Sequence, residues 1–338
     1  MKKIIVTGGA GFIGSNLILK LFKDHPDWTI MNIDKLTYAS DTGYLKPLRD
    51  SERYYFKKID LVDRDEVKDI VKTFQPDGVF HLAAESHVDN SISGPEPFIL
   101  SNVVGTFNIL EECRQLWQED EESWKNNRFV HVSTDEVYGE LEDDGFFTEQ
   151  TPYAPNSPYS ASKASSDMIV RAYFHTYGMN VITTNCSNNY GPHQHDEKLI
   201  PTVIRNAINH NPIPVYGKGE NVRDWLNVID HCSALETAFL KGKAGEVYNI
   251  GGNNEWKNIE LVHKLCDLLN EEVGNGPDGD YKNLIGFVTD RLGHDFRYAI
   301  DASKIKNELG WEPSTDFDGM LRHTVLWYID KYNASIKN

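Results

Sequence analysis

The sequence is poor in several features that would define other classes of protein. It has only four cysteines, Cys113, Cys186, Cys232 and Cys266, which are far apart and lack the close spacing of metal ligands. We therefore expect buried free thiols and no disulfide framework. No apolar run reaches membrane length, and the one at residues 4–6 ends at once in Thr7 and glycines. This start predicts the first strand of a cytoplasmic protein.

Basic residues are also scarce. Lys and Arg number 34 against 51 Asp and Glu, which gives a formal net charge of −17. This balance argues against general binding to nucleic acid or to an anionic membrane, and an anionic ligand would need a local basic pocket. The 338 residues are 40% hydrophobic and 25% charged, which suits one large or two moderate domains with a substantial core.

Strand-like and helix-like segments alternate through the first half of the chain. We expect strands at residues 3–7, 29–33, 54–60, 78–83, 128–133 and 180–185. We expect helices at residues 15–23, 65–74, 98–116 and 160–177. This order predicts an α/β fold, a Rossmann-type doubly wound parallel sheet with helices on both faces.

The sequence pattern changes after about residue 187, where the predicted elements become shorter and are separated by prolines and glycines. We expect a Rossmann domain at residues 1–187, to which 227–250 returns as a helix and a strand. Residues 188–226 and 251–338 would form a smaller mixed α/β substrate domain. The acidic run at 119–122 and the segment at 277–280 are expected to be surface loops.

The glycine-rich sequence GGAGFIG at residues 8–14 follows a predicted strand and opens a predicted helix. Its spacing, G-x-x-G-x-x-G, is a close variant of the dinucleotide fingerprint, in which glycine lets the backbone approach a pyrophosphate at a helix N-terminus. Asp34 ends the next strand, where a carboxylate accepts a hydrogen bond from a ribose 2′-hydroxyl and repels a 2′-phosphate. This favours NAD over NADP, although the adjacent Lys35 weakens the distinction.

Two further segments lie where a dinucleotide would pass. Asp60 follows the third predicted strand, and it fits an adenine contact and an ordinary turn or N-cap aspartate about equally well. Residues 83–86 (AAES) follow the fourth predicted strand and are mostly small, as expected of a loop beneath a dinucleotide.

The residues that carry chemistry lie in two stretches. Tyr159 and Lys163 are four apart, which on a helix places them on one face. An ammonium near a phenol favours the phenolate, so we expect this tyrosine to act as a base near neutral pH. Thr134, Asp135 and Glu136 supply a hydroxyl followed by two carboxylates. The hydroxyl, tyrosine and lysine suffice for hydride and proton transfer between an alcohol and a nicotinamide, and the acid pair suggests a further proton transfer.

Together these residues resemble the extended short-chain dehydrogenase/reductase family, and within it the nucleotide-sugar 4,6-dehydratases. The resemblance covers nearly the whole chain. It is carried by TGGAGFIG at 7–14, HLAAESHVD at 81–89, STDEVYG at 133–139, YSASK at 159–163, CSNNYGP at 186–192, EKLIP at 197–201, RDWL at 223–226 and DRLGHDFRY at 290–298. Leu292 and the pair Thr184-Asn185 depart from the family pattern.

The resemblance implies a dehydration of dTDP-glucose to dTDP-4-keto-6-deoxyglucose. NAD takes a hydride from carbon 4 while Tyr159 removes the hydroxyl proton, with Lys163 and Thr134 assisting. Glu136 then removes the proton on carbon 5, Asp135 protonates the hydroxyl leaving carbon 6, and the hydride returns to carbon 6. Asp135 and Glu136 need surroundings that separate their pKa values.

The resemblance also implies two sets of binding residues. The expected NAD contacts are Gly8, Gly11, Phe12, Ile13, Gly14, Asp34, Lys35, Asp60, Leu61, Ala83, Ala84, Ser101, Tyr159, Lys163 and Asn189. The expected substrate contacts are Ser86, Thr134, Asn188, Lys198, Leu199, Tyr216, Arg223, Asn258, Arg291 and His294. Cations in this second set would bind the diphosphate.

Other interpretations remain open. A UDP-sugar 4-epimerase or a decarboxylase of the same family would share the NAD, threonine, tyrosine and lysine, but an epimerase has no need of Asp135 and Glu136. A non-catalytic NAD-binding module is a more distant alternative. The H-x-H sequence at residues 193–195 is weak support for a metal site, and we expect none. Family members commonly pair through helices, which predicts a homodimer joined through residues 98–116 and 160–177.

Overall fold

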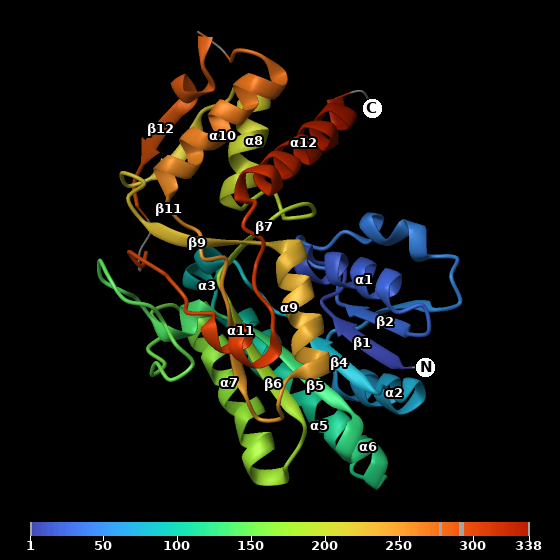
Figure 1. Ribbon diagram of the computed structural model, residues 1–338. Coiled ribbons are helices and arrows are strands. Elements are labelled where there is room, and N and C mark those ends of the chain that lie inside the picture. Colours follow the sequence, from blue (N-terminus) through green and yellow to red (C-terminus); the bar gives the residue numbers. More distant parts are fainter. Residues whose placement is uncertain (1, 277–278, 291–293, 337–338) are drawn as a thin grey trace.

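The main sheet is parallel and covered on both faces. The structure is a computed structural model that describes residues 2–276, 279–290 and 294–336. Within these residues, seven strands form a sheet in the order β10-β6-β5-β4-β1-β2-β3 (Figure 1). The strands are β1 (Lys3–Thr7), β2 (Thr29–Asp34), β3 (Tyr54–Lys58), β4 (Gly78–His81), β5 (Arg128–Thr134), β6 (Val181–Cys186) and β10 (Val247–Ile250). The predicted Rossmann-type sheet is confirmed.

The central strand β1 shows why both faces need helices. Ile4, Ile5 and Val6 are all fully buried, and because side chains alternate along a strand, Ile4 and Val6 enter one core while Ile5 enters the other. The first core is closed by α1 (Phe12–Asp24), α9 (Val228–Lys241) and α11 (Ser303–Leu309). The second is closed by α2 (Arg64–Phe74), α5 (Gly105–Trp117) and α7 (Pro158–Tyr177).

The segment expected to return to the first half does so, since α9 leads into β10, which pairs in parallel with β6. The long helix expected at 98–116 is divided into α4 (Glu96–Phe98), the π-helical η2 (Ile99–Val104) and α5. The acidic run at 119–122 was expected to be a loop, and this is wrong in part. The Asp120 carboxylate accepts a hydrogen bond from the Ser123 N–H at 2.8 Å and begins α6 (Glu121–Asn126), because carboxylates stabilise a helix N-terminus.

The remaining chain builds a smaller layer above the sheet (Figure 1). Its strands are β7 (Asn188–Tyr190), β9 (Val222–Asn227) and β11 (Glu255–Lys257) in one small sheet, and β8 (Ile213–Tyr216) and β12 (Ile285–Val288) in another. Its helices are α8 (Leu199–Ile208), α10 (Asn258–Val273), α12 (Phe317–Ile336) and the short η5 (Tyr281–Leu284). The three long helices share a core of their own. Pro277 and Asp278 of the expected surface loop lie outside the described residues.

The order of strands locates the crevice in which such a sheet binds ligands. From β1 the chain crosses to β2 and β3 on one side and later to β4, β5 and β6 on the other. The connections that leave the carboxyl ends of the paired strands β1 and β4 therefore run to opposite sides of the sheet, which makes this the topological switch point where α/β sheets of this kind hold their ligands. The glycine turn follows β1 directly.

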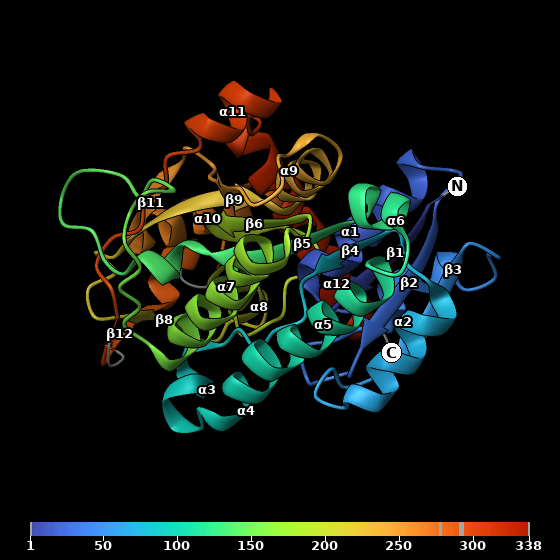
Figure 2. The same ribbon diagram turned by 90° about the horizontal axis from the view of Figure 1, so that it is seen from below.

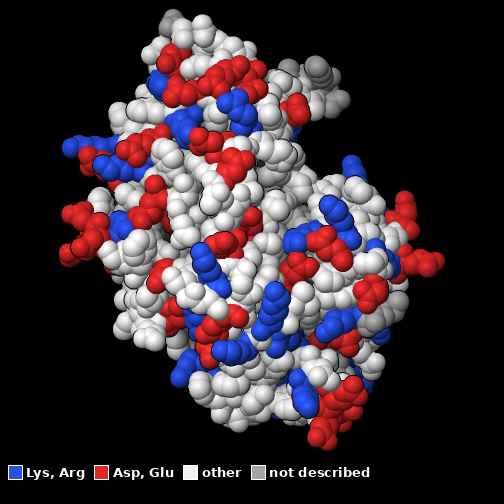
Figure 3. Space-filling view, viewed as in Figure 1, with Lys and Arg blue, Asp and Glu red and all other residues white. Residues whose placement is uncertain are grey.

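The thiols follow the expectation from composition. All four cysteines are buried free thiols. On the face shown in Figure 3, acidic and basic side chains are intermixed. Among the described helices, none is both long and apolar enough to cross a membrane.

Candidate active site

A cavity of about 320 Å³ opens at the carboxyl ends of β1, β2, β4 and β5. It is lined by every residue expected to bind the cofactor and by all five expected catalytic residues. Of the expected substrate contacts, Ser86, Thr134, Asn188 and Lys198 line the same cavity. Residues more than 100 positions apart in the sequence thus converge on one space.

The glycine turn forms one end of the cavity. Gly8 has φ +69°, and a Cβ built on it would lie 2.8 Å from the backbone of Ala83. A Cβ on Gly14 would lie 2.2 Å from the carbonyl oxygen of Gly8. Gly11 is the N-cap of α1 and offers no side-chain cap, so the first N–H groups of this helix face the cavity without a side-chain acceptor. The turn is shaped so that backbone can approach a bound phosphate closely.

Asp34 and Lys35 sit at the end of β2. The Asp34 carboxylate accepts hydrogen bonds from the N–H groups of Ala10 (3.0 Å) and Leu36 (2.8 Å) and from the Ser40 hydroxyl (2.9 Å). Two carboxylate oxygens have about four acceptor positions, so one remains for a ribose hydroxyl. Lys35 is engaged by Glu85 and the Ser101 hydroxyl, each at 2.7 Å. Its charge is therefore balanced within the fold, which removes the sequence argument for a 2′-phosphate.

Asp60 combines the two roles that the sequence left open. Its Oδ1 accepts a hydrogen bond from the Val62 N–H at 3.0 Å, which makes it a turn aspartate. It also lines the cavity beside Leu61.

Thr134, Asp135 and Glu136 follow one another where β5 ends. The Thr134 hydroxyl accepts a hydrogen bond from the Glu136 N–H at 3.3 Å and caps the 3₁₀ turn η3 (Asp135–Tyr138). Asp135 is 1% exposed, and its Oδ2 has no hydrogen-bond partner among the described residues. Burial, with Glu136 and Asp224 nearby, raises the pKa of Asp135 well above its usual range, against the opposing effect of Arg223. Glu136, by contrast, is only partly buried, so the two neighbouring acids have different surroundings.

Tyr159 and Lys163 occupy one face of α7, which begins with a capping box between Ser157 and Ser160. Both side chains are buried, and the Lys163 ammonium donates a hydrogen bond to the Val132 carbonyl at 2.8 Å. Burial raises the pKa of Tyr159 well above its usual range and lowers that of Lys163. The expectation that lysine alone lowers the tyrosine pKa is therefore wrong here, because desolvation dominates and the ammonium is bound to a carbonyl.

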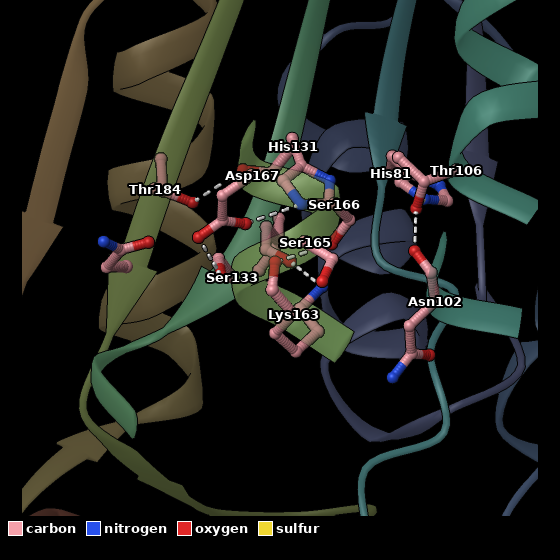
Figure 4. A network of polar contacts seen from close by, with 12 residues as sticks. His81, Asn102, Thr106, His131, Ser133, Lys163, Ser165, Ser166, Asp167 and Thr184 are labelled. Carbon is pink, nitrogen blue, oxygen red and sulfur yellow. Dashed lines mark hydrogen bonds and ion pairs between the residues drawn. The ribbon is translucent and has the colours of Figure 1, made fainter. Parts of the chain in front are cut away.

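A buried carboxylate joins α7 to β5 (Figure 4). Asp167, one turn after Lys163, accepts hydrogen bonds from Ser133 (2.8 Å), His131 (3.0 Å) and Tyr153 (3.0 Å). Ser133 and His131 flank Val132, so the same short piece of β5 binds both Asp167 and Lys163. Asp167 also opposes the fall in the pKa of Lys163. Asp167 was not among the site residues predicted from the sequence, although it stands four residues after Lys163 and therefore on the same face of the helix.

The π-helical segment η2 orients a second part of the wall. Asn102 lies within it and is fully buried. Its side chain accepts from the Glu85 N–H at 2.8 Å and donates to the Glu85 carbonyl (3.0 Å) and the Ser162 hydroxyl (2.8 Å). The loop at 83–86 is thereby fixed to α7. Periodicity alone predicted an ordinary helix here, so this residue was missed.

The wall contributed by the second half of the chain is more polar and more open. Asn188, Asn189, Glu197 and Lys198 line it, and Lys198 donates to the Ser86 carbonyl at 3.3 Å. Asn189 contacts His231 at 2.9 Å. Glu197 was missed as a site residue, although it stands in the EKLIP stretch.

The other expected substrate contacts lie outside this cavity. Arg223 is 4% exposed; its guanidinium donates to the carbonyls of Val222, Asp295 and Phe296 and lies over the Tyr298 ring. The four others not lining it are Leu199, Tyr216, Asn258 and His294. Arg291 lies outside the described residues, as does Leu292. Tyr298, which the sequence analysis did not select, is close enough to Glu136 for that carboxylate to raise its pKa.

The H-x-H sequence has a structural explanation. The ring of His193 stacks on Tyr44 at 3.9 Å, and its Nδ1 is 2.9 Å from the Ser15 hydroxyl. Burial lowers the pKa of His193 to about 4. No group of His, Cys, Asp and Glu suited to a metal ion occurs among the described residues.

The fold and the site together define a class, an NAD(P)-type oxidoreductase scaffold with the tyrosine–lysine pair of the short-chain dehydrogenases. The model of the GDP-mannose 4,6 dehydratase family matches residues 5–324, and the chain belongs to this family. It is 53% identical, over 97% of its length and 92% of the relative's, to the dTDP-glucose 4,6-dehydratase of Salmonella typhimurium.

Solved structures agree with this assignment. The dTDP-glucose 4,6-dehydratase of Bacillus anthracis, in complex with NAD, matches with a TM-score of 0.87 and 45% identity over 98% of both chains. The UDP-glucose 4-epimerase of Thermotoga maritima, with UDP-glucose, matches with a TM-score of 0.85 but 27% identity, over 98% of this chain and 99% of that one.

Proposed function

We propose that this protein is an NAD-dependent dTDP-glucose 4,6-dehydratase, a lyase that gives dTDP-4-keto-6-deoxyglucose. The observation that carries the proposal is the convergence of Asp135 and Glu136 with Thr134, Tyr159 and Lys163 in a cavity that also contains the dinucleotide turn. The relatives named above support the substrate and the reaction.

The residues present fit NAD. The turn at Gly8 and Gly14 leaves space that a Cβ would fill, and Asp34 keeps an acceptor position for a ribose hydroxyl. Lys35, bound to Glu85, offers no free cation for a 2′-phosphate. Bound NAD supplies the acceptor and later the donor of the hydride, and its ring charge favours the phenolate form of a nearby tyrosine.

The protein's own residues move the protons. Tyr159 takes the proton from the hydroxyl on carbon 4, and Thr134 holds that hydroxyl. The ketone acidifies carbon 5, where Glu136 removes a proton. Asp135, whose pKa burial raises well above its usual range, gives its proton to the hydroxyl that leaves carbon 6 as water. Glu136 returns its proton to carbon 5 as the hydride arrives at carbon 6.

The acid pair is the feature that favours dehydration over epimerisation. Both reactions begin with oxidation at carbon 4, which needs the threonine, tyrosine and lysine. Only elimination of water needs a base for carbon 5 and an acid for the leaving hydroxyl. Asp135 is buried and lines the cavity, and burial raises its pKa, which suits the acid.

For the substrate, we propose that Ser86, Asn188 and Lys198 contact it at the cavity. Leu199, Tyr216, Arg223, Asn258, Arg291 and His294 are proposed to serve the nucleotide end beyond the cavity. The corresponding division of the chain is a cofactor domain at 1–187 with 227–250, and a nucleotide-sugar domain at 188–226 and 251–338, from which α11 docks back against the first core.

We also propose a homodimer joined through the face formed by η2, α5 and α7. Figure 2 shows α5 and α7 side by side, and they are in contact. Large apolar side chains are exposed on this face at Ile99, Leu100, Phe107, Met168 and Tyr177. Such a surface is typical of an interface between subunits. The four free thiols suit a cytoplasmic location.

The test is to incubate the protein with dTDP-glucose, and in parallel with UDP-glucose, and to measure the alkali-induced absorbance of a keto sugar. We expect product with dTDP-glucose. In Glu136→Gln, exchange of hydrogen for deuterium at carbon 5 should be lost while transient NADH still appears. Unchanged turnover in this variant would refute the assignment of the base.

A further inference from the structure

We propose that the Thr134 hydroxyl carries a proton from Tyr159 to Asp135 at the end of each turnover and so resets the site without exchange with solvent. The inference rests on the proposed function, and it gives Thr134 a role beyond holding the sugar.

The need for such a step follows from the proton balance. Tyr159 gains one proton, from the hydroxyl on carbon 4, and keeps it because the product remains a ketone. Glu136 gains one proton from carbon 5 and returns it. Asp135 loses one proton to the departing water. After one turnover the phenol is neutral and Asp135 is a carboxylate, and the next cycle needs the reverse. One proton must therefore move from Tyr159 to Asp135.

Thr134 lies between these two groups. Its Oγ1 is 3.3 Å from Asp135 Oδ1, and it lies close enough to the Tyr159 phenol to oppose the rise that burial causes in the pKa of that group. The Glu136 N–H donates to the same oxygen at 3.3 Å. A threonine hydroxyl has one proton to donate and two lone pairs that accept. The Thr134 hydroxyl donates to Asp135 and accepts from the Glu136 N–H, which leaves one lone pair free to accept the proton of the nearby Tyr159.

The surroundings favour this internal route over solvent. Asp135 is 1% exposed, and Tyr159 and Thr134 are each 8% exposed. No described side chain contacts Asp135 Oδ2 by a hydrogen bond. Bulk water therefore has little access to the Asp135 carboxyl group or the Tyr159 phenol, whereas Thr134 lies beside both groups.

The step is balanced. The Tyr159 O–H bond breaks as its proton passes to Thr134 Oγ1, and the Thr134 O–H bond breaks as its proton passes to Asp135 Oδ1. Two O–H bonds form and two break, the negative charge moves from the carboxylate to the phenolate, and Thr134 ends as it began. Nothing is oxidised or reduced.

The test compares Thr134→Val, which removes the hydroxyl at nearly constant shape, with Thr134→Ser, which keeps both the hydroxyl and the cap on η3. Thr184→Val is the matched control, since Thr184 is a buried threonine on the neighbouring strand β6 that does not line the cavity. Product from dTDP-glucose is followed by rapid quench from the first turnover onward, at several concentrations of acetate and imidazole buffer.

In Thr134→Val the first turnover should itself be slower than in wild type, because the sugar hydroxyl loses a contact. We still expect a burst of about one product per site, followed by a steady rate at least about tenfold slower than the burst. This steady rate should rise with buffer concentration, because a small acid replaces the relay. Wild type, Thr134→Ser and Thr184→Val should show no dependence on buffer concentration. If Thr134→Val slows the first turnover and the later ones equally, with no effect of buffer, the relay is refuted and Thr134 only positions the sugar. A wild type that forms no keto sugar would refute the proposed function itself.

Discussion

The two walls of the cavity are built in different ways. On the wall of β5 and α7, Asp135, Tyr159 and Lys163 are nearly inaccessible to solvent, and their partners belong to the fold. On the opposite wall, Lys198 keeps a third of its side chain exposed, and Tyr216, which lies beyond the cavity on the same side, is 44% exposed. The difference indicates that the first wall is organised for chemistry before the sugar binds, whereas the second is organised for binding and leaves its polar groups in contact with water.

The test with the largest expected effect makes the same substitution on each wall. In Lys163→Met we expect kcat to fall roughly 10²–10⁴-fold, the usual contribution of a positioned acid–base group. In Lys198→Met we expect KM for dTDP-glucose to rise about tenfold with a smaller change in kcat, since a partly exposed charged hydrogen bond is lost. Steady-state kinetics check both. A Lys163→Met effect confined to KM would break the comparison.

The second test concerns the junction of β5 and α7. In Asp167→Asn, three hydrogen bonds to a buried carboxylate are weakened. We expect the free energy of unfolding to fall by about 3 kcal/mol, as for hydrogen bonds to buried charged groups. Urea denaturation measures it. Asp69→Asn, on the exposed face of α2, is the matched control and should remain within about 0.5 kcal/mol of wild type.

The third test uses pH and a buried histidine below the opposite wall. His231 is fully buried, and burial lowers its pKa to about 3, so the unfolded chain, with a histidine pKa of about 6.5, binds a proton that the folded chain does not. The fold is therefore not destabilised by this histidine above pH 6.5, where it is neutral in both states. As the pH falls below 6.5, the free energy of unfolding decreases, by about 2 kcal/mol at pH 5. His231→Gln should remove this part of the pH dependence.

His263→Gln is the matched control for that measurement, because His263 is exposed on α10. Denaturation at pH 7.5 and pH 5 should show the wild-type pH dependence in this variant. Equal pH dependence in wild type and His231→Gln would mean that His231 is protonated in the fold.

The smallest effect is expected at the rim of the second wall. The Tyr216 hydroxyl is 3.5 Å from Asp89 Oδ2 in an exposed position. Tyr216→Phe should change KM about threefold or less, at the low end of the net contribution of a hydrogen bond. Tyr159→Phe loses the same hydroxyl on the first wall and should lose roughly 10²-fold or more in kcat. Similar kinetics for the two variants would show that the walls do not differ in function.

Much of the first wall was predictable because its geometry is local. A helix places Tyr159 and Lys163 on one face, and a strand end places Thr134, Asp135 and Glu136 together. The glycine turn could be recognised from its spacing, because Gly8 and Gly14 lie so close to the backbone of Ala83 and Gly8 that a Cβ has no room. The π-helical turn at Asn102 and the cap at Asp120 were not foreseen, since both depend on which partner a side chain finds.

By itself, the sequence determined the parallel sheet, the glycine turn and the residues proposed as reacting groups, because these follow from periodicities and motifs within short segments. Only the tertiary structure decided their charge states and partners. Burial raised the pKa of Tyr159 against the prediction from Lys163 alone. The tertiary structure also pairs Lys35 with Glu85, encloses Arg223 among carbonyls, and holds Asp167 against the same piece of β5 that binds Lys163. The physical reason is that desolvation and long-range hydrogen bonds depend on every segment packed around a group, and no local pattern contains them.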